Sequence, residues 1–301
     1  MDRASLWMGA SLAQLEYLAP SSVDDAVKAL AASSGARVLA GGTDLIVQMK
    51  AGRAKPARVL DLKRIPGAIG IRREADGSFV IGAATPGAAI GEHAALAQAW
   101  PGVVEATTLI GSTQVQGRAS LGGNLCNASP AADSVPAMIA ARAVAVIVGP
   151  KGRREAAVET IQASPGRNTL GPGEFILEFK LPPRPTRSGD AYLRLIPRTE
   201  MDIAVVGAGV SLTLNVDGSV AAAHVSLGAV APTCLLVAAA GQALVGTKLE
   251  PTALDALDVA ARAACNPISD KRGTVEYRTK IAGVLARRAA QIAYDRAKAR
   301  A

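Results

Sequence analysis

The stretch at residues 120–133 reads SLGGNLCNASPAAD and concentrates polar and glycine residues in an otherwise apolar chain. It holds two glycines, two asparagines, two serines and one aspartate within 14 residues. Buried polar groups need hydrogen-bonding partners, so these side chains must meet one another or a polar ligand. The carboxylate of Asp133 suits the hydroxyls of a ribityl or ribose chain. The stretch therefore predicts a ligand-binding loop inside the fold.

A second glycine-rich segment, AGGTD at residues 40–44, follows a predicted strand over 36–40 and precedes a predicted helix over 45–50. Consecutive backbone N–H groups at glycines with positive φ form a concave anion site, and the start of a helix adds positive potential. Such a segment suits a phosphate or a pyrophosphate, but paired glycines also make ordinary turns, so both interpretations stay open. The chain has no Walker A or GxGxxG motif, and the triplet Gly-Ala-Gly at 207–209 favours close packing.

The composition counts against several classes of site. Aromatic residues make up 3% of the 301 residues, too few for a base-stacking nucleic-acid surface. The three cysteines, Cys126, Cys234 and Cys265, stand far apart and form no motif with the two histidines. Neither a disulfide framework nor a metal or iron–sulfur site held by this chain alone is expected. We interpret the cysteines as small core residues in a reducing compartment, the cytoplasm.

No membrane span and no signal peptide are expected. The longest uncharged run covers 225–247 and reaches 23 residues, but Pro232, Gly241 and several polar side chains interrupt it. We interpret this run as a strand, a turn and a short helix in a buried core.

The net charge of +8 is concentrated near the C-terminal end of the sequence. Residues 271–301 hold nine lysines and arginines against Glu276 and Asp295, and the rest of the chain is close to neutral. Apolar residues recur over 281–292 at helical spacing, which predicts a helix. We interpret its basic side chains as a solvated helix face, and a docking face for a partner chain and a nucleic-acid contact are the alternatives.

Predicted helices and strands alternate along the chain. Two serines at 21–22 precede an amphipathic helix over 23–30 and are suited to cap it. Shorter strands are predicted over 58–62, 78–83, 143–148 and 174–181, and two long strands over 202–216 and 221–230 are joined by the hairpin signal Asp217-Gly218. The run Pro-Pro-Arg-Pro at 182–185 is typical of a linker. These patterns predict one domain over residues 1–182 and a smaller α+β domain over 183–301.

Four ordered motifs resemble one protein family. They are AGGTDLIVQMK (40–50), ASLGGNLCNASPAADSVPAM (119–138), RTEMDIAVVGAGV (198–210) and PISDKRGTVEYR (267–278). They resemble the FAD-binding medium subunit of molybdenum hydroxylases, a group that includes the flavoprotein subunits of carbon monoxide dehydrogenase and of multi-subunit xanthine dehydrogenases. The resemblance runs from about Tyr17 to Arg288. It implies an α+β fold with a two-subdomain FAD-binding domain of the vanillyl-alcohol-oxidase (PCMH) type, followed by a smaller α+β carbon-monoxide-dehydrogenase-flavoprotein C-terminal domain.

The resemblance also implies which residues bind the cofactor FAD. The segment 40–44 would hold the FAD pyrophosphate through backbone N–H groups, 120–124 would form a second cofactor loop, and Asp133 would hydrogen-bond the sugar-alcohol chain. An apolar residue at 170, an aromatic at 192 and a cation at 194 would lie beside the flavin ring. The implied cofactor-binding residues are Val38, Leu39, Ala40, Gly41, Gly42, Thr43, Asp44, Leu45, Ser120, Leu121, Gly122, Gly123, Asn124, Asp133, Leu170, Tyr192 and Arg194. The sequence departs from the family at 115–124, where it reads VQGRASLGGN and relatives often read IRNRGTIGGN.

The resemblance implies an electron-transfer role and no catalytic residue or metal ligand in this chain. A large partner with a molybdenum cofactor would oxidise the substrate, and a small partner with two [2Fe–2S] clusters would carry electrons to the FAD. The electrons would then pass to NAD⁺, a quinone or O₂, in an oxidoreductase assembled as a heterohexamer. A self-sufficient FAD-dependent oxidase of the same superfamily is the alternative, although His93 and His224 lie outside both loops, away from any place for a covalent flavin link. A third hypothesis is an assembly protein that has lost FAD, and the intact glycines of both segments argue against it.

Overall fold

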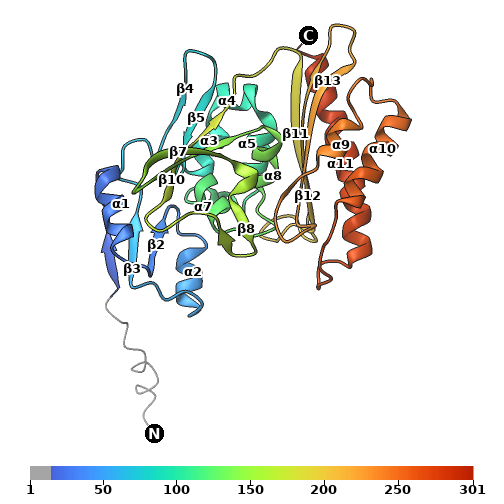
Figure 1. Ribbon diagram of the computed structural model, residues 1–301. Coiled ribbons are helices and arrows are strands. Elements are labelled where there is room, and N and C mark those ends of the chain that lie inside the picture. Colours follow the sequence, from blue (N-terminus) through green and yellow to red (C-terminus); the bar gives the residue numbers. More distant parts are fainter. Residues whose placement is uncertain (1–14, 301) are drawn as a thin grey trace.

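The computed structural model describes residues 15–300 and places a small parallel sheet at the N-terminal side of the molecule (Figure 1). Its strand order is β1-β3-β2, and all three strands run in the same direction. Helix α1 starts after Ser22, whose Oγ accepts a hydrogen bond from the Asp25 backbone N–H at 3.1 Å, as the sequence predicted. The elements of this part are β1 (Glu16–Leu18), α1 (Val23–Ala31), β2 (Ala36–Leu39), α2 (Leu45–Lys50) and β3 (Arg58–Asp61).

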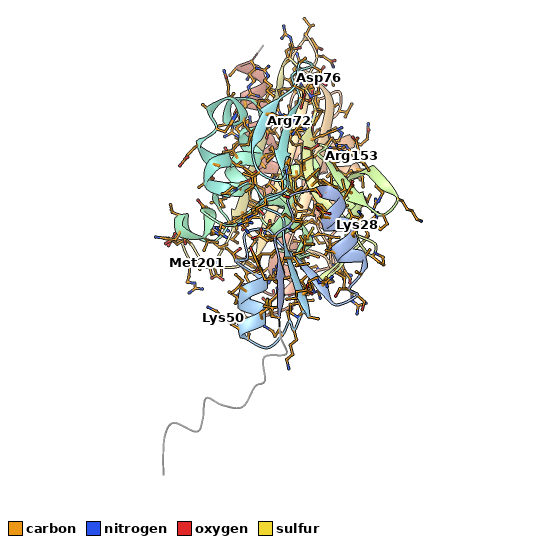
Figure 2. The ribbon with its side chains drawn as sticks, turned by 90° about the vertical axis from the view of Figure 1, so that its left-hand side faces the viewer. Lys28, Lys50, Arg72, Asp76, Arg153 and Met201 are labelled. Carbon is orange, nitrogen blue, oxygen red and sulfur yellow. The ribbon has the colours of Figure 1, made fainter. Side chains whose placement is uncertain are left out.

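A five-stranded antiparallel sheet follows, in the order β4-β5-β10-β6-β7. Its strands are β4 (Ile71–Arg73), β5 (Phe79–Gly82), β6 (Val144–Gly149), β7 (Gly152–Ala157) and β10 (Phe175–Leu181). On the central strand, the buried carboxylate of Glu178 pairs with Arg72 at 2.9 Å and with Arg153. These two arginines, labelled in Figure 2, come one from each edge strand. The pairing satisfies a charge that the sheet would otherwise bury alone.

The chain between β5 and β6 folds into short helices that cover one face of this sheet (Figure 1). Phe79, Ile147 and Phe179 from the strands pack with Leu125 and Met138 from the helices in one buried core. These helices are α3 (Gly87–Glu92), α4 (Ala94–Ala99), α5 (Pro101–Thr108), α6 (Thr113–Gln116), α7 (Leu121–Cys126) and α8 (Ser134–Ala140). A 3₁₀ turn, η2 (Val158–Thr160), and a two-stranded ribbon, β8 (Gln162–Ser164) with β9 (Arg167–Asn168), lie between β7 and β10.

The remainder of the chain forms a four-stranded antiparallel sheet in the order β11-β12-β13-β14, with α8 on one face and α11 on the other. Glycines allow this close packing: a Cβ on Gly209 would lie 2.6 Å from the Pro136 carbonyl oxygen, and one on Gly189 would lie 1.9 Å from that of Ala293. The sequence-based prediction of close packing at 207–209 is confirmed. The elements are β11 (Ser188–Leu195), β12 (Val206–Leu214), β13 (Val220–Gly228), β14 (Leu235–Leu236), α9 (Ala238–Gln242), α10 (Pro251–Ala263) and α11 (Val275–Lys298).

The predicted hairpin at Asp217-Gly218 is confirmed, since Gly218 has φ of +85° between β12 and β13. The residues that follow, 225–247, contain the end of β13, then β14 and α9, as predicted. No helix in the described part of the chain combines the length and apolar character needed to cross a bilayer. The α+β class is confirmed, and the division of the chain at residue 182 stays a prediction.

The view of the basic C-terminal segment as a solvated helix face is only partly right. Arg278 is buried and donates hydrogen bonds to the Val205 carbonyl oxygen and the Asp270 carboxylate, both at 2.7 Å. Arg296 pairs with Glu105 on α5 and donates to the Asp190 carbonyl oxygen at 2.8 Å. These arginines therefore connect α11 to the rest of the fold. Their partners lie on other elements, so the residue spacing within the helix could not predict them.

Candidate functional site

A cavity of about 500 Å³ lies at the carboxyl ends of β2 and β3, where the small parallel sheet meets α7 and the segment before β10. Parallel strands β2 and β3 are in register from Ala36 with Arg58 to Leu39 with Asp61, so both end at this edge. Ligands commonly bind at the carboxyl edge of parallel strands, because loops of variable sequence leave the sheet there. The cavity walls come from residues 38–45, 119–127 and 168–176, together with smaller contributions from the end of α1 and from Ile110.

The segment 40–44 presents open backbone donors to this cavity. Among the residues that the structure describes, no protein acceptor takes a hydrogen bond from the backbone N–H groups of residues 41–44. Gly42 has φ of +83°, the left-handed conformation that glycine adopts without strain. A Cβ on Gly41 would lie 1.7 Å from the Arg118 carbonyl oxygen, so only glycine permits the two segments to touch here. Open donors on such a cradle suit an anionic group such as a phosphate.

The segment 120–124 has a different structure from the expected loop, since it forms the start of helix α7. Ser120 is the N-cap, and its Oγ accepts a hydrogen bond from the Gly123 N–H at 3.2 Å. The Gly122 N–H donates to the Ala83 carbonyl oxygen at 2.9 Å, and a Cβ on Gly122 would lie 2.6 Å from that same atom. Gly122 therefore permits close packing of α7 on the chain after β5. Helix propensity disfavours paired glycines, so nothing local in the sequence indicates this helix.

Several hydrogen-bonded side chains complete the cavity wall. Gln48 Nε2 donates to Asn127 Oδ1 at 2.9 Å, and Asn168 Nδ2 donates to the Cys126 carbonyl oxygen at 3.1 Å. Glu174 accepts from the Gly171 N–H at 2.8 Å and pairs with Arg154 on β7 at 2.7 Å. The hydrogen bond from Arg154 lowers the pKa of Glu174 to about 2. Sequence reasoning missed Gln48, although it lies within the motif at 40–50, and it missed Asn168 and Glu174, which lie outside the four motifs.

Asp133, Tyr192 and Arg194 form a buried cluster beside the site. Arg194 Nη1 lies 2.8 Å from Asp133 Oδ2, and the Tyr192 hydroxyl donates to Asp133 Oδ1 at 3.3 Å. Burial raises the pKa of Asp133 to about 6, although the charge of Arg194 opposes this shift. Asn124 connects the cluster to the cavity wall, because its Oδ1 accepts hydrogen bonds from the backbone N–H and the hydroxyl of Ser134, at 3.2 and 2.7 Å.

Most of the predicted cofactor-binding residues come together around the cavity. Those that line it are Val38, Leu39, Ala40, Gly41, Gly42, Thr43, Asp44, Leu45, Ser120, Gly122, Gly123, Asn124 and Leu170. Leu121, the first residue of α7, is buried in the core. Asp133, Tyr192 and Arg194 form the neighbouring cluster and do not line the cavity. That all of these residues contact the cofactor stays a prediction.

The geometry fits a cofactor that carries phosphates. The open N–H groups of 41–44 offer the donors that a pyrophosphate needs, and the apolar side chains of Val38, Leu39 and Leu170 line the remainder of the cavity. The fold and this site define an α+β protein with an extended cavity that suits a nucleotide cofactor, and one wall of this cavity carries a row of free backbone donors.

Comparison with known proteins gives the family. Residues 13–184 match the family "FAD binding domain in molybdopterin dehydrogenase", and residues 191–293 match "CO dehydrogenase flavoprotein C-terminal domain". The chain belongs to this family, the FAD-binding subunits of molybdenum hydroxylases of the carbon monoxide dehydrogenase and xanthine dehydrogenase type, which are oxidoreductases.

Two curated relatives and two solved structures illustrate the likeness. The chain is 38% identical to the carbon monoxide dehydrogenase medium chain of Afipia carboxidovorans, over 94% of this chain and 98% of that one. It is 28% identical to the xanthine dehydrogenase FAD-binding subunit of Escherichia coli O157:H7, over 87% and 90% of the two chains. The structure of reconstituted CO dehydrogenase from Oligotropha carboxidovorans matches with a TM-score of 0.89 at 37% identity, over 94% and 98%. That of the enzyme from Hydrogenophaga pseudoflava matches with a TM-score of 0.89 at 35% identity, with the same coverage.

Proposed function

We propose that this chain carries FAD as the electron-transfer subunit of a three-subunit molybdenum hydroxylase. In this role it receives electrons from the [2Fe–2S] clusters of a small subunit and delivers them to NAD⁺, a quinone or O₂. Bound FAD supplies the redox chemistry, and the protein supplies binding, orientation and electrostatics. The observation that carries the proposal is the open row of backbone N–H groups at 41–44, which faces a cavity walled by a second motif of the same family.

The residues of the first segment would hold the pyrophosphate. Backbone N–H groups of residues 41–44 would donate to phosphate oxygens, and Val38, Leu39 and Leu45 would pack beside them. Charge-assisted hydrogen bonds of this kind are stronger than neutral ones, so several of them together can contribute substantially to holding a pyrophosphate. The first turn of α7, from Ser120 to Asn124, would form the opposite wall.

The buried cluster would act near the flavin end of the cofactor. Asp133 would accept a hydrogen bond from the sugar-alcohol chain, while Leu170 and Tyr192 would contact the ring. Arg194 would orient Asp133 through their 2.8 Å ion pair and would lie near the ring. When Asp133 is ionised, its negative charge cancels most of the positive potential of Arg194. Arg194 would therefore raise the reduction potential of the flavin strongly only when Asp133 is protonated.

Partner subunits follow from the names of the relatives. Several are called the medium chain or medium subunit of an enzyme complex, among them the carbon monoxide dehydrogenase medium chain and the nicotine 6-hydroxylase medium subunit. We place this chain with a small iron–sulfur subunit and a large molybdenum-cofactor subunit, in a heterohexamer in the cytoplasm. The unpaired state of Cys126, Cys234 and Cys265 agrees with a reducing compartment.

The substrate of the complex would be set outside this chain. Relatives of this chain are subunits of enzymes named for carbon monoxide, xanthine, nicotine and caffeine. We also place a domain boundary at residue 182, since among the described residues the strands before it pair only with one another and β11 to β14 form their own sheet. The later domain, residues 183–301, would close the flavin end of the site through β11.

A visible absorption spectrum of the purified chain, with and without its co-expressed neighbours, tests the proposal. The expected result is the pair of absorption bands of oxidised flavin, which disappear on reduction with dithionite, and release of FAD on acid treatment. Broad iron–sulfur absorption should appear only with the neighbours. A colourless chain that also fails to bind added FAD in the presence of its partners would contradict the proposal.

A further inference from the structure

A lysine that the family motifs leave out lies directly behind the glycine segment. Lys63 Nζ donates a hydrogen bond to the Ala40 carbonyl oxygen at 3.0 Å, the last carbonyl before Gly41. Lys63 does not line the cavity, whereas its neighbour Leu62 does. The lysine therefore reaches the segment from outside the cavity.

Two further residues hold this lysine in place. Asp61 Oδ1 accepts hydrogen bonds from the Lys63 ammonium at 2.7 Å and from the Lys63 backbone N–H at 2.9 Å. The Tyr17 hydroxyl donates to the other carboxylate oxygen, Oδ2, at 2.7 Å. Asp61 is only 6% exposed, and burial alone would raise its pKa, but the hydrogen bonds from Lys63 and Tyr17 and the charge of Lys63 lower it overall. The carboxylate is thus ionised, fully paired and fixed at the end of β3.

The direction of one peptide group connects this cluster to the cavity. All peptide bonds among the described residues are trans. In a trans peptide the C=O and N–H groups point in opposite directions, because the peptide unit is planar. The Ala40 carbonyl points to Lys63, so the N–H of Gly41, in the same peptide unit, must point away from Lys63.

We propose that Lys63, held by Asp61 and Tyr17, is a positioning residue that turns the Gly41 N–H toward the FAD pyrophosphate. The proposal rests on FAD binding at this cavity, as described above. Lys63 acts through the backbone and not as a phosphate ligand, since its ammonium is already shared between the Ala40 carbonyl and Asp61. Without the lysine, the glycine-rich segment has no side chain to fix this peptide, and glycine itself offers little resistance to a flip.

Binding titrations on the full-length chain, stripped of FAD, distinguish this role from a direct charge effect. The Kd for FAD is measured by quenching of flavin fluorescence. Lys63→Met should raise the Kd about tenfold or more, as expected when one charge-assisted hydrogen bond is lost. Asp61→Asn should also weaken binding, because the lysine is then no longer held. If Lys63 were a direct phosphate ligand, Asp61→Asn would free its charge and strengthen binding instead.

Two variants serve as controls. Lys63→Arg keeps a donor near the Ala40 carbonyl and should restore most of the affinity. Lys50→Met removes an exposed lysine at the end of α2 that makes no ion pair with the described residues, and it should leave the Kd unchanged (Figure 2). Phosphorus NMR of bound FAD adds a signature of position: the pyrophosphate resonances should shift in Lys63→Met and stay unchanged in Lys50→Met.

The outcomes separate this proposal from the proposed function. If the wild-type chain does not bind FAD, the function itself fails. If the wild type binds FAD and Lys63→Met binds it equally well, with unchanged phosphorus resonances, only the role of Lys63 is overturned. If Lys63→Met does not fold, as judged by thermal unfolding of the FAD-free chain, Tyr17→Phe removes the outermost hydrogen bond. A Kd raised about two- to threefold in Tyr17→Phe supports the proposal, and an unchanged one overturns it.

Discussion

The two glycine-rich segments of this chain, 40–44 and 120–124, look alike in sequence but differ in what their backbones do. In the first, the N–H groups of residues 41–44 have no acceptor among the described residues. In the second, the Gly122, Gly123 and Asn124 N–H groups are all used, by the Ala83 carbonyl oxygen, the Ser120 hydroxyl and the Ser120 carbonyl oxygen. The first segment can therefore bind a ligand with its backbone, and the second shapes the wall opposite.

The glycines are required for different reasons in the two segments. Gly41 and Gly42 permit a close approach and a positive φ in a segment without regular structure. Gly122 permits a helix to pack closely on the chain after β5. A pair of glycines in a sequence indicates positions where a side chain would not fit. The hydrogen-bond partners of the backbone then show whether the glycines pack against the protein itself or leave donors free for a ligand.

Gly41→Ala should break the first segment and have the largest effect. A Cβ at this position would lie 1.7 Å from the Arg118 carbonyl oxygen, so the backbone must move and the row of N–H groups with it. We expect the Kd for FAD to rise about 100-fold or more, which corresponds to about 3 kcal/mol. Gly35→Ala is the matched control, since its Cβ would meet nothing nearer than 3.9 Å. Retention of tight FAD binding by Gly41→Ala would show that the cofactor does not depend on this segment.

Gly122→Ala should lower the unfolding free energy and leave the backbone N–H donors of residues 41–44 in place. Its Cβ would lie 2.6 Å from the Ala83 carbonyl oxygen and 2.8 Å from the Ala83 Cβ. Overpacking of this kind costs about 1–3 kcal/mol, to be measured by denaturant unfolding of the FAD-free chain. The Kd for FAD of the folded fraction should change less than about threefold. A loss of affinity as large as that of Gly41→Ala would mean that both segments bind the cofactor in the same way.

Local signals in the sequence predicted the elements that have a clear pattern of their own, and many shorter elements were missed. The helix over 23–30, the hairpin at Asp217-Gly218 and the strand over 36–40 each have a cap, a turn or an apolar pattern of their own. The short helices α3 to α8 and the strands β1, β4, β7, β8, β9 and β11 were not predicted. Strand β7 is an edge strand and carries charged residues, and β11 contains a glycine because Gly189 packs closely on α11. Neither reason is visible in the strand itself.

The site follows the same rule. The glycine motifs mark the cavity in the sequence because backbone contacts demand particular residues at fixed spacing. The ion pair between Asp133 and Arg194 joins residues far apart in the chain, and Lys63 reaches Ala40 only because β2 and β3 end together. Such contacts depend on the register of a sheet, which single-sequence patterns do not determine.

Asn124→Ala tests how much the hydrogen bonds between Asn124 and Ser134 stabilise the second segment. Its side-chain oxygen accepts two hydrogen bonds from Ser134 at the start of α8. Losing this acceptor leaves the Ser134 donors unsatisfied in a part-buried place, and we expect a loss of about 1 kcal/mol in unfolding free energy. Asn124→Asp keeps the acceptor and should be milder. Equal stability of the alanine variant and the wild type would contradict this view of the wall.

Gly123→Ala should have the smallest effect and gives the finest test of the comparison. This glycine lies inside α7, where alanine is preferred by about 0.5–1 kcal/mol, and its Cβ would meet only the Ser120 hydroxyl at 3.3 Å and the Ala40 Cβ at 3.9 Å. Stability should therefore stay equal or rise slightly. The new methyl group would point across the gap to the first segment, so the Kd for FAD should rise only about threefold. A much larger rise, in a variant whose fold and N–H groups are intact, would mean that the cofactor passes directly against this Cα, and the second segment would then be a binding surface in its own right.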